Sequence, residues 1–252
     1  MELLLLSNST NHGGRPWAHA ASELAEFAAG ADTGAGVFVP YALADHDAYT
    51  EAVAKPFAAA GVELTGVHTA EDPVAAVAAA RFIVVGGGNT FRLLRALQRS
   101  GLIEPLRQAV AGGARYVGAS AGTNITAPTI RTTNDMPIVE PDSFRALELV
   151  PFQINPHYVD ADPDSRHMGE TRETRLREFG EENDVAVLGL REGTYLRVSG
   201  DTAKIGGKAV SAHAPGPAIL FRRGGEPEEI SGDVSGLLSF PAEFDVPEEL
   251  PA

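Results

Sequence analysis

The sequence predicts an α/β fold, in which a mostly parallel sheet is covered by helices on both faces in three α/β/α layers. Short apolar runs alternate with helix-like segments along the chain, and most of these runs are apolar without interruption. Such runs, separated by helices, are typical of parallel strands that are buried on both sides. With 252 residues the chain is long enough to bury a large core and is expected to form one α/β domain.

The elements follow one another in regular order. Strands are expected at Leu3–Leu6, Gly36–Tyr41, Val62–Val67, Arg81–Gly86, Tyr116–Ser120, Pro151–Asn155, Val185–Leu190, Thr194–Val198 and Ala218–Arg222. Helices are expected at about Pro16–Ala29, Asp47–Ala60, Pro73–Ala80, Thr90–Arg99, Ile103–Ala111 and Ser165–Phe179. The last three strands are short and spaced like hairpins, so the sheet should be mixed at one edge.

The end of the chain differs in composition. From about Gly224 glycine, proline and glutamate dominate, so residues 1–223 are assigned to the domain and 224–252 to an acidic extension. We expect Glu243–Ala252 to be a solvated tail without a catalytic part.

Charge and cysteine content exclude several functions. The net charge of −14 disfavours nonspecific binding to nucleic acid or to anionic membranes, since both require a basic face. No cysteine is present, which excludes disulfides, thiolate metal sites and cysteine nucleophiles. The first residues carry no basic segment before the apolar run, and no stretch reaches the roughly 20 apolar residues of a membrane span. A cytoplasmic protein is expected.

The run Gly118-Ala119-Ser120-Ala121-Gly122 is typical of a nucleophile elbow, a sharp turn from a strand into a helix. Side chains at Gly118 or Gly122 would collide with neighbouring backbone in such a turn. The turn exposes the Ser120 hydroxyl, and the following helix start offers N–H groups to an oxyanion. The alternative is a tight turn with a purely structural role.

Two further groups follow strands of the same predicted sheet. His157 comes after Pro151–Asn155, and Glu192 after Val185–Leu190. Because ligands bind at the carboxyl ends of strands in open sheets, Ser120, His157 and Glu192 are expected to meet there as nucleophile, base and orienting acid. Asp135, in a polar loop after the elbow, is the rival acid and would give the chain order of α/β-hydrolases. It could equally be a turn residue that caps backbone N–H groups.

The glycine run before Asn89 joins a strand to a helix. It lacks the lysine and the spacing of a phosphate-binding loop, so we interpret Gly87 and Gly88, with Ala121, as donors to an oxyanion. No cofactor is indicated. The spacing of His157 and His167 is not that of metal ligands, so a metal site there is not expected.

Long runs of the chain resemble the peptidase E family of α-aspartyl dipeptidases. They are Ala127-Pro-Thr-Ile-Arg-Thr-Thr-Asn-Asp-Met-Pro-Ile-Val-Glu-Pro141, Leu149-Val-Pro-Phe-Gln-Ile-Asn-Pro-His-Tyr158 and Gly169-Glu-Thr-Arg172. The resemblance covers nearly the whole chain except its final segment. It implies a flavodoxin-like or class I glutamine amidotransferase-like fold and hydrolysis of dipeptides that begin with aspartate. It also implies Ser120 as nucleophile, His157 as base, Glu192 as the third member and Asp135 as another acid linked to activity.

An N-terminal aspartate would bring a carboxylate and a free amino group to the site. Arginine suits the carboxylate, and the resemblance points to Arg172, with Arg131 second and Asn89 as a further contact. Asp135 or Glu140 could bind the amine. Small peptides are the expected partners, and a homodimer or higher homo-oligomer stays open. Two alternatives remain, a cyanophycinase-like enzyme that cleaves β-aspartyl-arginine bonds and a binding module without catalysis.

Overall fold

The computed structural model describes residues 1–29, 36–161 and 169–246. Its strands are β1 (Glu2–Leu6), β2 (Gly36–Val39), β3 (Leu64–Gly66), β4 (Phe82–Val85), β5 (Arg115–Ala119), β6 (Gln153–Tyr158), β7 (Val187–Arg191), β8 (Thr194–Ser199), β9 (Thr202–Gly207), β10 (Ala218–Phe221), β11 (Glu228–Ile230) and β12 (Gly232–Asp233). Its α-helices are α1 (Ala21–Ala29), α2 (His46–Ala59), α3 (Pro73–Ala79), α4 (Thr90–Arg99), α5 (Ile103–Ala111), α6 (Ala121–Asn124) and α7 (Arg172–Glu182).

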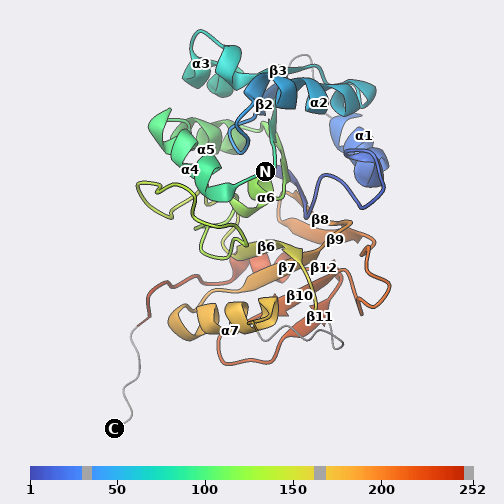
Figure 1. Ribbon diagram of the computed structural model, residues 1–252, viewed down its shortest axis with the longest axis vertical. Helices are drawn as coiled ribbons and strands as arrows, with labels where there is room; N and C mark the ends of the chain where they lie inside the picture. The colour runs from blue at the N-terminus through green and yellow to red at the C-terminus, as the bar shows by residue number, and fades with distance from the viewer. Residues whose placement is uncertain (30–35, 162–168, 247–252) are drawn as a thin grey trace.

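The strands form two sheets (Figure 1). The larger has the order β12-β9-β8-β1-β5-β4-β2-β3, and the smaller has the order β11-β10-β7-β6. Strands β1, β5, β4, β2 and β3 are parallel, whereas β8, β9 and β12 run antiparallel to their neighbours. The predicted α/β class and the mixed edge are confirmed.

Strand β1 shows why the apolar runs are uninterrupted. Leu3 and Leu5 pack into one core with apolar residues of α3, α4 and α5, while Leu4 and Leu6 pack on the other face with residues of α1 and α2. Successive side chains of a strand point to opposite faces, so a strand between two helical layers must be apolar at every position.

The expectation of a single sheet is wrong. Predicted strands at Pro151–Asn155, Val185–Leu190 and Ala218–Arg222 correspond to β6, β7 and β10, which pair with one another in the smaller sheet. One face of that sheet joins the core of the larger sheet through Leu188 and Leu190, and the other packs against α7. Apolar periodicity reports burial on both faces, and it does not report which strands pair.

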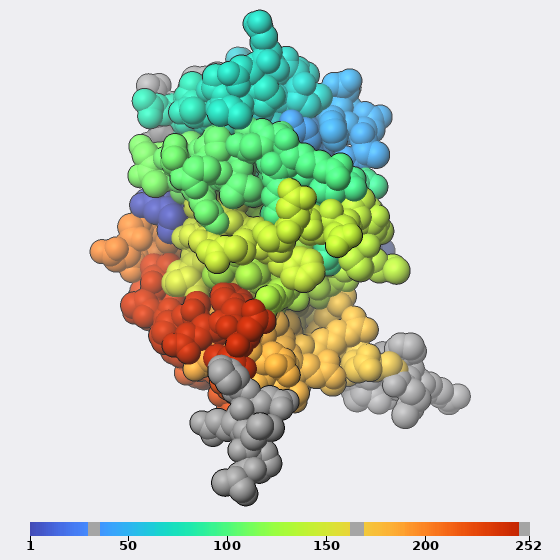
Figure 2. Space-filling view, turned by 90° about the vertical axis from the view of Figure 1, so that its left-hand side faces the viewer, coloured from blue at the N-terminus to red at the C-terminus, as the bar shows by residue number. Residues whose placement is uncertain are grey.

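The segment after residue 224 contributes to both sheets. Strand β11 pairs with β10, and β12 pairs with β9. Leu237 is buried, and Glu243 exchanges backbone hydrogen bonds with Asp184. Figure 2 shows the last described residues, in red, lying against the body of the molecule. Part of the expected tail, residues 243–246, is therefore attached to the fold, and residues 247–252 lie outside the described ones.

Two further differences concern element boundaries. Helix α7 begins at Arg172, after its cap Thr171, whereas the sequence predicted a start near Ser165, and residues 162–168 lie outside the described part. Strand β9 was not predicted, because only Ala203 and Ile205 are buried in it and it ends in two glycines, so it has no continuous apolar run. None of the helices in the described part is both long and apolar enough to span a bilayer.

Candidate active site

Ser120 follows β5 directly and occupies a sharp turn. Its backbone has φ 55° and ψ −112°, a conformation that L-residues rarely adopt, and its N–H donates to the Leu6 carbonyl at 3.1 Å. A Cβ on Gly118 would collide with the Gly122 carbonyl, and one on Gly122 would collide with the Val85 carbonyl. The predicted need for glycine at both positions is confirmed, and helix α6 begins immediately after the serine.

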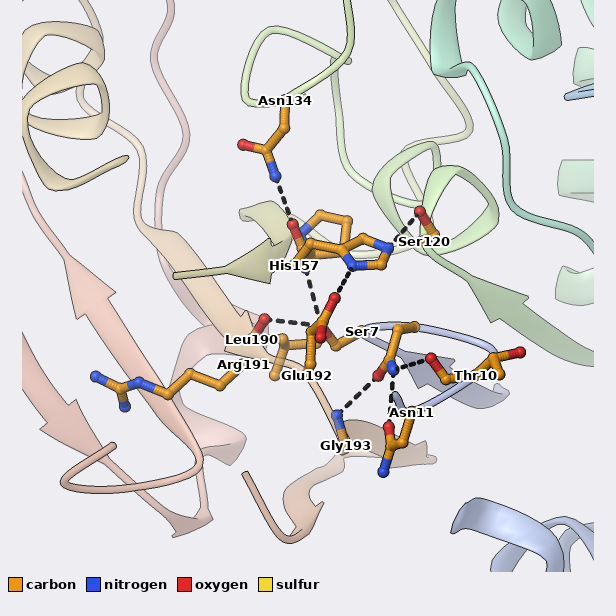
Figure 3. A network of polar contacts seen from close by, with 12 residues as sticks. Ser7, Thr10, Asn11, Ser120, Asn134, His157, Leu190, Arg191, Glu192 and Gly193 are labelled. Carbon is orange, nitrogen blue, oxygen red and sulfur yellow. Dashed lines mark hydrogen bonds and ion pairs between the residues drawn. The ribbon is translucent and has the colours of Figure 1, made fainter. Parts of the chain in front are cut away.

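The His157 imidazole lies between Ser120 and Glu192 (Figure 3). Its Nε2 is 2.9 Å from Ser120 Oγ, and its Nδ1 is 2.7 Å from Glu192 Oε1. The side chains of His157 and Glu192 are 38% and 41% exposed, so a small substrate can reach them. With Nδ1–H donating to the carboxylate, Nε2 is free to accept the serine proton.

The three groups come from two sheets, contrary to the expected single edge. Ser120 follows β5 of the larger sheet, His157 lies in β6, and Glu192 follows β7 of the smaller sheet. One face of the smaller sheet packs into the core of the larger sheet, so the two sheets lie next to each other (Figure 1). The His157 contacts to Ser120 and Glu192 lie where they meet.

The backbone at His157 is irregular. The pairing of β6 with β7 shifts between Asn155 and Tyr158, and His157 has φ 54°. Its N–H donates to Ser7 Oγ at 2.9 Å, and Asn134 Nδ2 donates to the preceding Pro156 carbonyl at 2.8 Å. A positive φ costs of order 1–3 kcal/mol for a residue other than glycine, so these bonds help to hold a conformation that β6 would not adopt alone.

Asp135 makes no hydrogen bond to His157. Its Oδ2 accepts from the Thr90 N–H at 2.7 Å and from the Thr90 hydroxyl at 2.6 Å. Thr90 is the first residue of α4, so Asp135 caps the helix that follows the glycine loop. Glu192, rather than Asp135, is the carboxylate within hydrogen-bond distance of the imidazole.

The glycine loop lies against the nucleophile. A Cβ on Gly87 would be 3.0 Å from the Ser120 Cβ, and Gly88 has φ 133°, which favours glycine. Within the described part of the chain, the backbone N–H groups of Gly87, Gly88 and Ala121 donate to no protein acceptor. These are the three groups that the sequence assigned to an oxyanion.

Asn89 is already engaged on both sides of its amide. Its Oδ1 accepts from the Arg92 N–H at 3.0 Å as the cap of α4, and its Nδ2 donates to the Met136 carbonyl at 2.9 Å. Asn89 therefore ties the glycine loop to the Asp135 loop, and its use as a substrate contact stays a prediction.

The two candidate arginines differ in their surroundings. Arg131 binds both carboxylate oxygens of Asp245, at 2.7 and 3.0 Å, and also Asn183 at the end of α7, so both of its terminal nitrogens already have partners. This arrangement speaks against its predicted substrate contact. Arg172, half-buried at the start of α7, has no ion-pair partner among the residues that the structure describes. Burial and the charge of Arg175 lower the pKa of Arg172, while attraction to Asp135 opposes them.

Sequence reasoning missed several residues that shape the site. Ser7 and Asn8 follow β1 and reach the backbone on both sides of Glu192. Tyr49 donates its hydroxyl to the Gly87 carbonyl at 3.1 Å. The rule that strand ends gather at one edge of a parallel sheet could have indicated Ser7 and Asn8, because β1 is the neighbour of β5. His167, the other histidine of the disfavoured metal pair, lies outside the described residues.

Comparisons with known proteins identify the family of this chain. Residues 3–206 match the model of Peptidase family S51. The chain is 58% identical to a Peptidase E of Streptomyces coelicolor over 97% of this chain and 98% of that protein. It is 47% identical to a Probable alpha-aspartyl dipeptidase of Drosophila melanogaster, over 94% and 97% of the two chains.

A solved structure supports the fold. A peptidase from an acI-B1 actinobacterium superposes with a TM-score of 0.62 over 92% of this chain and 96% of that chain, at 14% identity. With the family match over most of its length, the chain belongs to peptidase family S51 and is a serine-type peptidase.

Proposed function

We propose that this protein hydrolyses dipeptides with an N-terminal aspartate, using Ser120, His157 and Glu192 as a catalytic triad. The observation that carries the proposal is the imidazole between a hydroxyl at 2.9 Å and a carboxylate at 2.7 Å, in a part-exposed site. This is the arrangement of nucleophile, base and orienting acid in serine hydrolases.

In the first step Ser120 Oγ attacks the peptide carbonyl while His157 Nε2 accepts the hydroxyl proton. The carbonyl oxygen becomes an oxyanion that the free N–H groups of Ala121 and of Gly87 or Gly88 would hold. His157 then protonates the leaving amine and an acyl-enzyme forms, which water cleaves by the same route in reverse. Glu192 stabilises the imidazolium in both steps.

Recognition of aspartate is assigned to Arg172 and Asp135. Arg172 has a half-buried guanidinium without an ion-pair partner in the described part, and its planar fork fits a carboxylate. Asp135 Oδ2 accepts both hydrogen bonds from Thr90, and Oδ1 has no hydrogen-bond partner among the described residues. Oδ1 would therefore accept a hydrogen bond from the substrate ammonium group. Glu140 remains the alternative for the amine.

The test is hydrolysis of a panel of X-Leu dipeptides together with β-Asp-Arg. Asp-Leu should be cleaved and its neutral analogue Asn-Leu much more slowly, since the arginine would lose its charged partner. Ser120→Ala should remove turnover while the protein stays folded. Preferential cleavage of β-Asp-Arg would instead indicate a cyanophycinase-like enzyme, and no hydrolysis of any Asp-X peptide with no labelling of Ser120 would indicate a binding module.

A further inference from the structure

Ser7 and Asn8 form a polar contact between the two sheets. They follow β1 directly, next to the strand that ends at Ser120, and both are almost fully buried. A buried polar side chain is retained at low cost only where its hydrogen bonds are made. Ser7 makes its hydrogen bonds to backbone groups of β6 and β7 in the smaller sheet (Figure 3). Asn8 bonds to the Gly193 N–H in the turn after β7 and to Thr10 and Asn11 in its own loop.

The Ser7 hydroxyl contacts the two strands that carry the base and the acid. It donates to the Leu190 carbonyl in β7 at 2.8 Å and accepts from the His157 N–H at 2.9 Å. One oxygen atom thus fixes the distance between the residue of the base and the end of the strand that leads to Glu192.

Asn8 contacts the residue that follows Glu192 in the chain. Its Oδ1 accepts from the Gly193 N–H at 2.7 Å, and its Nδ2 donates to the Thr10 carbonyl at 2.9 Å and to Asn11 Oδ1 at 2.8 Å. The contacts at Leu190 and Gly193 therefore flank Glu192 in the chain, and both begin at the end of β1.

We propose that Ser7 and Asn8 act as a positioning clamp, which holds the His157–Glu192 pair of the smaller sheet in register with Ser120 of the larger sheet. The proposal rests on the proposed function, because it assigns the clamp a role in that reaction. Neither residue touches the reacting atoms. They matter because catalysis tolerates little error, a misplacement of about 1 Å costing about 100-fold in rate.

The clamp also explains how the positive φ of His157 persists. The bend turns the imidazole away from the regular β6 pairing, and the N–H that the bend releases needs an acceptor. Ser7 Oγ is that acceptor. Without it, His157 can relax toward ordinary strand geometry, and Nε2 leaves the serine.

The experiment compares Ser7→Ala with a matched control, Thr132→Val. Thr132 is also buried and donates its hydroxyl to the Ile154 carbonyl of β6 at 3.0 Å, but it does not contact His157 or Leu190. Ser7→Ala should lower kcat for Asp-Leu by about 10- to 100-fold with KM within about threefold, because positioning and not binding is lost. Thr132→Val should lose comparable thermal stability and keep kcat near the wild-type value.

A second measurement is independent of the dipeptide. The rate at which a fluorophosphonate labels Ser120 reports nucleophile activation, and it should fall in Ser7→Ala by a factor similar to kcat. Ser7→Thr keeps the hydroxyl and should recover most of both. Asn8→Ala, which removes the acceptor for Gly193, should lower both to a smaller extent and replaces Ser7→Ala if that variant does not fold.

The outcomes separate the two proposals. Wild-type kcat and labelling in Ser7→Ala, or in Asn8→Ala where Ser7→Ala does not fold, would overturn the clamp while leaving the dipeptidase proposal intact. An equal loss in Thr132→Val would overturn it too, since general destabilisation would then explain the effect. If wild-type protein cleaves no Asp dipeptide, the dipeptidase proposal fails, and the labelling rate still decides the clamp. Absence of labelling in the wild type would overturn both.

Discussion

The two halves of the candidate site hold strained residues by different means. Ser120 and His157 both have positive φ, 55° and 54°. At Ser120 the strained turn is possible because Gly118 and Gly122 have no side chain. A Cβ on either glycine would collide with a backbone carbonyl, that of Gly122 or of Val85. At His157 the strain is accommodated by hydrogen bonds: the His157 N–H donates to Ser7 Oγ, and Asn134 donates to the preceding Pro156 carbonyl.

Because of this difference, substitutions in the two halves should affect different properties of the protein. The elbow is local, since the glycines that permit it lie within two residues of Ser120. The bend at His157 depends on Ser7, which lies far away in the sequence. We therefore expect changes at the elbow to act on folding first, and changes around His157 to act on turnover first.

The largest effect should come from the acid of the smaller sheet. Glu192→Ala should lower kcat for Asp-Leu by about 1,000- to 10,000-fold, because the imidazole loses its orienting partner. Asp135→Ala should lower kcat less and raise KM, because it loosens the glycine loop and removes the proposed amine contact. Steady-state kinetics on folded variants decide between them, and a larger loss of kcat in Asp135→Ala would contradict our assignment of the acid.

Next is the elbow of the larger sheet. Gly122→Ala places a methyl group against the Val85 carbonyl, which belongs to backbone and cannot swing away. We expect it to lower the free energy of unfolding by about 3 kcal/mol or more. Gly236→Ala is the control, since a Cβ there meets no atom within 4 Å. Denaturant titration measures both, and equal stability of the two variants would show that the elbow does not need its glycine.

A smaller effect is expected on binding at the start of α7. Arg172→Met should raise KM for Asp-Leu by about 10- to 100-fold, because the substrate carboxylate loses a charge-assisted pair of hydrogen bonds. The melting temperature should change little. Arg131→Met is the matched control and should leave KM unchanged, since that guanidinium binds Asp245. If KM rose in Arg131→Met and stayed unchanged in Arg172→Met, Arg131 and not Arg172 would bind the substrate aspartate.

The smallest effect concerns Tyr49, which supports the glycine loop beside the elbow. Tyr49→Phe removes the bond to the Gly87 carbonyl and should cost about 1 kcal/mol at neutral pH. Burial raises the pKa of Tyr49 from 10.0 to about 12. The folded chain thus keeps the phenol proton more tightly than the unfolded chain, so this contribution is complete below pH 10 and is lost as the pH rises through about 12.

The free energy of unfolding, measured between pH 7 and 12, tests two expectations for this variant. Tyr49→Phe should be less stable at pH 7 and should lose less stability than the wild type between pH 10 and pH 12. Parallel curves for the two proteins would show that Tyr49 does not titrate in this way.

The sequence by itself determined the parts of the protein that depend on neighbours along the chain. Gly118 and Gly122 around Ser120 specify the elbow, and the unbroken apolar run of β1 specifies a strand buried on both faces. The glycine loop before α4 was also found, because its position between a strand and a helix is a local property.

Only the tertiary structure decided how the strands divide into two sheets and what holds His157. Apolar patterns state that β6, β7 and β10 are buried, but pairing depends on contacts between distant segments, which no local pattern encodes. For the same reason Ser7 and Asn8, two ordinary polar residues after a strand, could not be connected with His157 and Gly193. Likewise, only the coordinates show that an oxygen of Glu192, and not of Asp135, lies within hydrogen-bond distance of an imidazole nitrogen of His157. That distance depends on how segments far apart in the sequence pack.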